Sequence, residues 1–422
     1  MATMTMSPTS VHQGFRPRNP VTLLDAGLNQ NMLVDLMLKL TLLDGVTTLG
    51  RLASQMKVSM TIMDQLFRHF RREQLCEVKG MVSNDYELTL SVAGRKLAQD
   101  RYAISQYIGP APVKLNDYCQ AVRDQAARHP VSRAMLQEVF FDLVLTDLML
   151  DQIGPAIISN TTIFLYGPTG NGKTSIAERL VRIYKDYVYI PYAIEVEGQI
   201  VNIFDSVVHQ ALDNQEEDVD PRWILCRRPC IATGGELVPE MLELRFDESL
   251  GFYSAPLQMK ANNGLFIIDD FGRQMINPRD LLNRWIVPLD RRVDFLSLRT
   301  GVKFPIPFET LVVFSTNLDP RQLADEAFLR RIQNKIKVDA MTPEIFDSIL
   351  ERVCNDAAMP FDTDMAAYLR ANCNPDGKGV LRACYPRDMV RIIQSIADYE
   401  HRRPELTKRD LDRAINLYFA KS

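Results

Sequence analysis

The segment GPTGNGKT, residues 167–174, joins three glycines to a lysine and a threonine at a spacing that suits phosphate binding. It follows an apolar, β-rich run over residues 162–166 and precedes a predicted helix. Gly167, Gly170 and Gly172 permit backbone conformations closed to other residues, so successive amide groups can turn toward a polyphosphate at the helix amino terminus. The sequence therefore predicts a phosphate-binding loop.

Two other apolar runs also end in polar side chains that suit phosphate chemistry. LFIIDD ends in Asp269 and Asp270, and LVVFSTN ends in Asn317. An aspartate at the end of a buried strand can hold Mg²⁺ through water, and an asparagine there can orient the water that attacks a γ-phosphate. We therefore expect Asp270 and Asn317 to take part in the hydrolysis of a nucleoside triphosphate.

ATP and Mg²⁺ are the cofactors that these residues predict. Lys173 is expected to reach the β- and γ-phosphates, and Thr174 and Asp269 are expected to form the metal site. The residues expected to bind the nucleotide all lie on the loop or at the metal: Gly167, Pro168, Thr169, Gly170, Asn171, Gly172, Lys173, Thr174, Ser175 and Asp269.

The composition is that of a globular protein with room for several cores. The chain has 422 residues, of which 46% are hydrophobic and 24% charged, so we expect two or three domains. The formal net charge of -4 excludes a global basic field that would draw the chain to nucleic acid or anionic membrane. Residues 1–20 lack the apolar core of a signal peptide, which predicts a cytoplasmic protein with no membrane insertion.

The amino-terminal part of the chain predicts a small domain of helices and one hairpin. Ser59 is a candidate N-cap for its third helix. Helices are expected over residues 31–43, 46–56, 59–74 and 92–102, and strands over residues 75–80 and 86–91. This order of elements resembles a winged helix-turn-helix domain.

The rest of the chain predicts an α/β fold. Strands alternate with helices beyond residue 150, which is typical of a parallel sheet covered by helices, and a run of helices follows at the carboxyl end. The predicted parts are a disordered tail (1–22), a winged-helix domain (23–107), a linker with a helical segment (108–150), an α/β ATPase core (151–340) and a helical lid (341–422).

From about residue 115 to its end, the chain resembles an AAA+ ATPase. GPTGNGKT, LFIIDD, the asparagine of FSTN, the arginine pair of EAFLRRI and the arginine of YPRDM occur in the order typical of that family. The resemblance is greatest to the branch of the MoxR-type ATPases, the magnesium-chelatase ATPase subunit and the bacterial enhancer-binding activators. It implies a P-loop core, a helical lid and a homo-oligomeric ring, with a hexamer favoured.

The resemblance also implies roles for three arginines. Arg331 matches the arginine finger that reaches the nucleotide of a neighbouring subunit, and Arg330 is the alternative. Such a finger neutralises charge on the transferred phosphoryl group and is worth roughly 10³ to 10⁵ in rate. Arg387 matches the lid arginine that reports the γ-phosphate to the helical bundle.

Asp270 stands where the resembled family usually has a glutamate. Its shorter side chain sets the carboxylate roughly 1.5 Å back, and a displacement of about 1 Å can lower a rate on the order of 10²-fold. We therefore expect an ATPase of modest rate. A switch that binds ATP with negligible turnover is the alternative.

Two insertions of the resembled branch also have counterparts here. Phe252 and Tyr253 lie where a loop facing the pore of a ring is expected, although the sequence is equally compatible with ordinary core packing of these aromatic side chains. Residues 293–308 predict a hairpin that turns at residues 299–301.

The leading functional hypothesis is a ring-forming ATPase that remodels a protein partner or complex, with the winged helix as adaptor. The alternative is a DNA-directed protein, such as a transcription regulator, helicase loader or branch-migration motor, that binds duplex DNA with the winged helix. Arg68, Arg71 and Arg72 lie in the second half of the predicted third helix. Acidic residues accompany Lys79 in the wing, so the charge footprint for DNA is poor.

Overall fold

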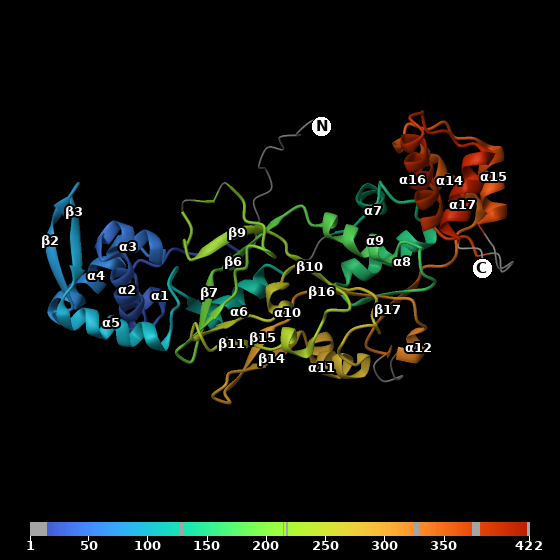
Figure 1. The fold of residues 1–422 in the computed structure, drawn as a ribbon. Coiled ribbons are helices and arrows are strands. Elements are labelled where there is room, and N and C mark those ends of the chain that lie inside the picture. Colours follow the sequence, from blue (N-terminus) through green and yellow to red (C-terminus); the bar gives the residue numbers. More distant parts are fainter. Residues whose placement is uncertain are drawn as a thin grey trace.

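The computed structural model describes residues 15–126, 130–213, 215–216, 218–323, 329–373 and 380–419. A small amino-terminal domain lies at one end of the molecule, a larger α/β core in the middle and a group of helices at the carboxyl end (Figure 1). Each of these three parts contains buried apolar side chains that stabilise it.

The amino-terminal domain contains the expected helices and hairpin. Its elements are α1 (Leu23–Ala26), α2 (Gln30–Asp44), β1 (Val46–Thr48), α3 (Leu49–Met56), α4 (Met60–Arg72), β2 (Cys76–Val82), β3 (Asp85–Leu90) and α5 (Val92–Ile104). The strands form an antiparallel sheet in the order β1-β3-β2. Ser59 caps α4, because its side chain accepts a hydrogen bond from the amide of Ile62.

The first residues of α3 differ from the expectation. The sequence predicts a helix over residues 46–56, but Val46–Thr48 forms β1 and pairs with β3. These β-branched side chains favour extended backbone. The side chain of Thr48 then accepts a hydrogen bond from the amide of Arg51, so α3 begins at Leu49.

A parallel sheet of five strands forms the centre of the core. It contains β5 (Ile163–Tyr166), β10 (Cys230–Thr233), β13 (Leu265–Ile268), β16 (Leu311–Thr316) and β17 (Asn334–Lys337). Their order is β10-β13-β16-β5-β17, and every neighbouring pair is parallel. The α/β fold expected from the alternation of strands and helices is confirmed.

Helices cover both faces of this sheet. The helix α8 (Asp147–Ile158) shares a buried cluster with Leu265 and Ile267 of β13, whereas Phe266 and Ile268 belong to a second cluster on the other face. In the second cluster, Trp285 of α11 (Pro278–Arg291) is fully buried. Because β13 is buried on both faces, its sequence is a continuous apolar run without alternation.

A second group of strands lies between the central sheet and the amino-terminal domain (Figure 1). One sheet has the order β11-β12-β8-β7-β4, with β4 (Val113–Lys114), β7 (Ala193–Val196), β8 (Gln199–Asn202), β11 (Arg245–Asp247) and β12 (Phe252–Ser254). A pair joins β6 (Tyr187–Pro191) to β9 (Trp223–Arg227). The expected hairpin is also present, as β14 (Val293–Ser297) and β15 (Lys303–Pro307).

The remaining elements connect these sheets. They are α6 (Leu115–Asp124), α7 (Arg133–Val139), α9 (Lys173–Arg179), η1 (Leu180–Ile183), η2 (Pro239–Leu242), α10 (Leu257–Lys260) and α12 (Pro320–Leu323). No helix in the described part of the chain combines the length and the apolar character that crossing a membrane requires.

Phe252 and Tyr253 are packing residues and do not form an exposed loop. Tyr253 is only 2% exposed, and its hydroxyl oxygen accepts a hydrogen bond from the amide of Arg299 at 3.0 Å. The ring of Phe252 contacts that of Tyr107, with 5.5 Å between centroids. The pore-loop expectation is therefore wrong for these two aromatic side chains, and β12 instead joins the core to the amino-terminal domain.

The segment before α1 is ordered where the structure describes it. The ring of Phe15 lies 5.6 Å from that of Trp223 and 6.4 Å from that of Tyr189, and Arg16 forms an ion pair with Glu216. This packing differs from the expected disordered tail over residues 1–22, because a buried aromatic contact fixes the backbone beside it. Residues 1–14 lie outside the described residues.

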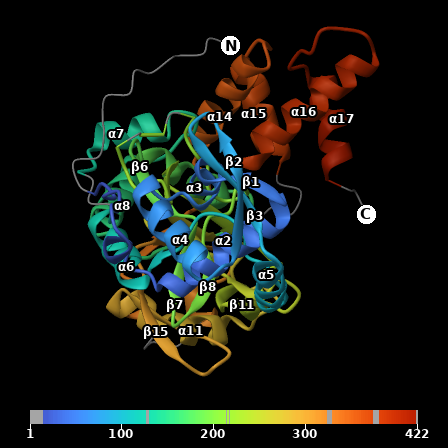
Figure 2. The ribbon, with the colours of Figure 1, turned by 90° about the vertical axis from the view of Figure 1, so that its left-hand side faces the viewer.

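The carboxyl-terminal helices form a bundle to one side of the core (Figure 2). They are α14 (Pro343–Asp356), α15 (Thr363–Asn372), α16 (Cys384–Tyr399) and α17 (Lys408–Tyr418). Their buried side chains, including Phe346, Leu369 and Ile393, form a cluster of their own. We call residues 343–419 the lid.

Candidate active site

Three strands of the central sheet end beside one another at the same edge. The strands β13, β16 and β5 are parallel neighbours. Asp269 follows β13, Asn317 follows β16, and Gly167 follows β5. Parallel neighbours bring their carboxyl ends together, which is the usual place for ligands in such sheets. The structure thus unites the three motifs that the sequence singles out.

Lys173 lies at the centre of this edge. It begins α9 and is only 6% exposed. Its Nζ donates hydrogen bonds to the carbonyl oxygens of Gly167 (2.9 Å) and Pro168 (2.8 Å) and to Oδ1 of Asn317 (2.6 Å). Burial lowers the pKa of Lys173, while the nearby carboxylates of Asp270 and Asp269 oppose that shift.

Thr174 and Asp269, the two residues predicted as metal ligands, face each other. The hydroxyl of Thr174 donates a hydrogen bond to Oδ2 of Asp269 at 2.8 Å. The other carboxylate oxygen, Oδ1, is buried and has no hydrogen-bond partner among the described residues. A buried carboxylate oxygen without a donor is unfavourable unless a cation satisfies it. These hard oxygen ligands therefore fit Mg²⁺.

Asp270 is exposed, and its backbone is in the left-handed region, with φ of 48°. Few residues other than glycine adopt this conformation, and such residues are common at functional sites. Nδ2 of Asn317 donates a hydrogen bond to Oδ1 of Asp270 at 3.0 Å. Asn317 is thus bonded to both Lys173 and Asp270.

Gln274 supports the turn that carries the two aspartates. Its Nε2 donates to the carbonyl oxygen of Asp269, and its Oε1 accepts from the amide of Gly272, each at 2.8 Å. Sequence reasoning missed this positioning residue, because a glutamine after a strand is not diagnostic by itself. The signal available was its place four residues after Asp270 in a turn that contains glycine.

The phosphate loop needs glycine at Gly167. Its φ is 139°, and a Cβ atom there would lie 2.3 Å from the carbonyl oxygen of Val338. Gly172 caps α9 with φ of 82°, Thr169 is exposed, and Ser175 lies half-buried in the first turn of α9. Residues 167–172 therefore form a turn directly before α9, with glycines at three positions of positive φ.

The lid contacts the phosphate loop directly. The amide of Cys384 donates to the carbonyl oxygen of Gly170 at 2.9 Å, and the amide of Ala383 donates to Oδ1 of Asn171 at 3.4 Å. Nδ2 of Asn171 in turn donates to the carbonyl oxygen of Asp339 at 2.9 Å. We call residues 382–384 the strap. The sequence contains no motif that predicts this contact.

The three expected arginines lie on other segments of the chain than the phosphate loop. Arg330 is exposed and Arg331 half-buried, and both precede β17 at the outer edge of the sheet. Residues 326–328 of the motif EAFLRRI lie outside the described residues. Arg387 is exposed in the first turn of α16, and the hydrogen bonds of the described residues do not join it to the phosphate loop.

Comparisons with known proteins show similarity in parts of the chain. A family described as "Domain of unknown function (DUF8689)" matches residues 342–417, which correspond to the lid. A search of curated proteins found no match.

Several solved structures resemble the chain at low sequence identity. NtrX from Brucella abortus has 16% identity and a TM-score of 0.41, with 69% of this chain and 61% of that chain covered. The RuvB Holliday junction branch migration motor from Thermotoga maritima has 12% identity and a TM-score of 0.37, with 69% and 72% covered. This chain therefore spans less than two thirds of the NtrX chain.

Proposed function

We propose that the chain is an AAA+ ATPase that binds ATP with Mg²⁺ on the phosphate loop and hydrolyses it. The observation that carries this proposal is the network at the sheet edge. Asn317 is bonded to both Lys173 and Asp270, and Thr174 is bonded to Asp269. Phosphoryl transfer needs groups of these kinds around a glycine loop: an amine, a pair of carboxylates, a hydroxyl and an amide.

Each residue has a role in the proposed reaction. The amides of residues 167–174 bind the phosphates, and Lys173 moves from the loop carbonyl oxygens to phosphate oxygens. Thr174 and Asp269 would hold Mg²⁺, which would supply positive charge beside the γ-phosphate. Asn317 orients the attacking water, and Asp270 accepts its proton. The backbone turn at Asp270 brings its short side chain within reach of Asn317 and supports turnover at a modest rate.

We further propose that hydrolysis occurs between subunits of a homo-oligomeric ring, with a hexamer favoured. Arg331, or Arg330 as the alternative, reaches the nucleotide of the neighbouring copy. The position of both residues before the edge strand β17 supports this proposal, since an edge element can face another chain. A guanidinium at that place stabilises the charge of the transferring phosphoryl group.

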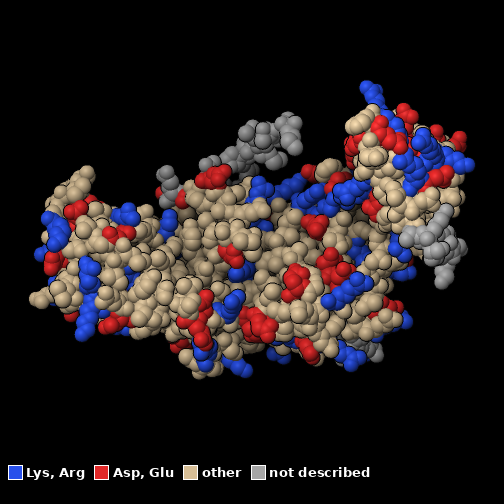
Figure 3. Space-filling view, in the orientation of Figure 1, with Lys and Arg blue, Asp and Glu red and all other residues tan. Residues whose placement is uncertain are grey.

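The amino-terminal domain is proposed to recruit a protein that the ring remodels. Its wing exposes apolar side chains: Val78 (41%), Met81 (56%) and Val82 (51%). Such a cluster is more typical of a protein-binding surface than of one that binds the DNA backbone. On the amino-terminal domain, at the left of Figure 3, Lys and Arg side chains are mixed with Asp and Glu.

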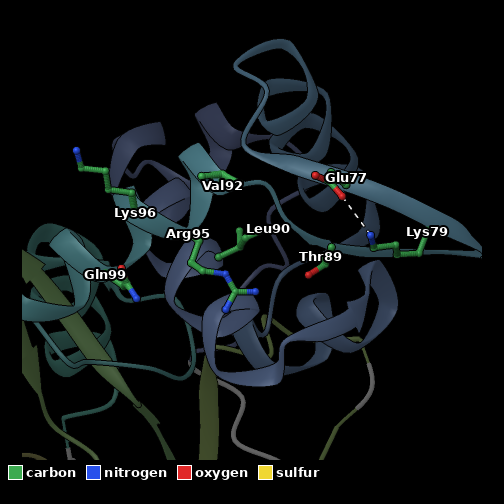
Figure 4. Close-up of a pocket in the computed structure, with 8 residues that line it drawn as sticks. All are labelled: Glu77, Lys79, Thr89, Leu90, Val92, Arg95, Lys96 and Gln99. Atoms are coloured by element: carbon green, nitrogen blue, oxygen red, sulfur yellow. Dashed lines mark hydrogen bonds and ion pairs between the residues drawn. The ribbon is translucent and has the colours of Figure 1, made fainter.

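The cations of this domain are partly engaged within the domain. Arg72 bonds to Glu73, and the guanidinium of Arg71 lies 5.9 Å from the ring centre of Phe67. In the groove between the wing and α5, Lys79 bonds to Glu77, while Arg95 points toward the groove floor (Figure 4). These contacts favour a protein partner over duplex DNA. The positive charges of Arg95 and Lys96 would suit an acidic surface on that protein.

Phosphate release by the purified full-length protein tests the enzymatic part of the proposal. We expect release that depends on Mg²⁺ and is abolished by Lys173→Ala. An ATP-binding protein with no release above the Lys173→Ala background would instead be a nucleotide-gated switch. A salt-sensitive shift of labelled duplex DNA by the full-length protein would favour the DNA-directed alternative.

A further inference from the structure

The strap places an arginine against the phosphate loop that the sequence does not single out. A Cβ atom built on Gly170 would lie 3.4 Å from Cδ of Arg382 and 3.6 Å from its Cβ. The next two residues of the strap donate their amides to Gly170 and to Asn171. The aliphatic part of Arg382 is therefore packed on the loop itself.

The guanidinium of Arg382 is only partly satisfied. Its Nε is buried and has no hydrogen-bond acceptor in the part of the chain that the structure describes, and its Cζ lies 5.8 Å from the ring centre of Tyr385. A buried N–H group without an acceptor is unfavourable, so a ligand that brings an acceptor gains from the contact. Guanidinium groups bind phosphate oxygens with two parallel hydrogen bonds.

We propose that Arg382 binds the phosphate groups of a nucleotide held on the phosphate loop. This inference rests on the proposed function, and it assigns to the lid a binding residue other than Arg387. Arg387 is exposed one turn into α16, whereas Arg382 contacts Gly170.

The position of Arg382 also indicates which phosphates it binds. The atoms nearest to a Cβ on Gly170 belong to Cys384 and Arg382. Asp270 and Asn317 lie instead at the strand ends, where the γ-phosphate is expected. Arg382 therefore binds the phosphates that ADP and ATP share, and Arg387 is left to distinguish the two nucleotides.

Titration of the full-length protein with ADP and with ATP tests this inference. The Asp270→Asn variant serves as the parent protein, so that ATP is not consumed. Three further variants are made on it: Arg382→Met keeps the packing against Gly170 without the charge, Arg382→Ala removes both, and Arg382→Lys keeps a cation. Arg391→Ala, an exposed arginine of α16, is the matched control.

We expect Arg382→Met and Arg382→Ala to weaken ADP and ATP equally, by about tenfold, because each loses a charged hydrogen bond. Arg382→Lys should retain part of the affinity, and Arg391→Ala all of it. Unchanged ADP affinity in Arg382→Met would overturn the inference, as would a loss confined to ATP. If the parent protein binds neither nucleotide, the proposed function itself fails.

Discussion

Asn317 accepts a hydrogen bond from Lys173, with 2.6 Å between Oδ1 and Nζ. The same amide donates from Nδ2 to Asp270. One side chain thus connects the amine that is expected to bind phosphate with the carboxylate that is expected to accept a proton. In the proposed reaction, a triphosphate would compete for Lys173 and so free Oδ1 of Asn317 to orient water.

Substitutions of Asn317 distinguish the roles of its two hydrogen bonds, to Lys173 and to Asp270. Asn317→Asp can still accept from Lys173 but cannot donate to Asp270, and it adds a second negative charge beside that carboxylate. We expect Asn317→Ala to lower turnover by roughly tenfold to 10²-fold through lost positioning. Asn317→Asp should be slower still. ATP affinity should change little in Asn317→Ala and should fall in Asn317→Asp, because the added carboxylate pairs with Lys173 and repels the triphosphate. Steady-state phosphate release and ATP titration measure these effects, and an Asp variant faster than the Ala variant would contradict the assigned roles.

Replacement of Asp270 tests its role as proton acceptor. Asp270→Asn keeps the size of the side chain and removes its charge, so ATP should bind while hydrolysis falls by about 10²-fold to 10⁴-fold. Asp398→Asn, an exposed position on α16, is the control and should match the wild type. Single-turnover hydrolysis under saturating ATP makes the comparison, and a turnover within twofold of the control would remove Asp270 from the mechanism.

The lowered pKa of Lys39 leads to a prediction of how the free energy of unfolding depends on pH. It is 4% exposed in α2, its Nζ donates to the carbonyl oxygen of Ser105 at 3.0 Å, and burial lowers its pKa to about 8 despite the nearby Asp35. Between this value and the ordinary 10.5, the unfolded chain binds more protons than the folded one. The free energy of unfolding should therefore rise with pH across that window, by about 3 kcal/mol from this group.

Denaturant titrations between pH 7 and pH 10.5 measure the contribution of Lys39 as the difference between the wild type and Lys39→Met. In Lys39→Met, the free energy of unfolding should lack the part of the rise with pH that comes from Lys39. The control Lys96→Met, at an exposed position, should show the same rise as the wild type. If the free energy of unfolding depended on pH in the same way in the wild type and in Lys39→Met, the pKa of Lys39 would not be lowered by folding.

The sequence predicts the centre of the candidate site because each part of it is local. Gly167, Asp269 and Asn317 each end an apolar run, and parallel pairing of those runs is enough to bring them together. The strap is different. Cys384 and Gly170 are far apart in sequence, and their contact depends on how the lid packs against the loop. Likewise, the sequence alone does not distinguish Phe252 from an exposed loop residue, because its packing depends on the contact with Tyr107.

The most direct test of the account mixes two variants that should each be inactive. Lys173→Ala should not hold the nucleotide, and Arg331→Ala should lack the proposed finger and hydrolyse roughly 10³-fold more slowly. In a mixed ring, an Arg331→Ala subunit holds ATP while its Lys173→Ala neighbour supplies the arginine. Phosphate release should reappear when the two variants are mixed before they assemble, so that mixed rings form. The proposed mechanism would be contradicted by a mixture as inactive as its components, or by an Arg331→Ala protein with wild-type turnover.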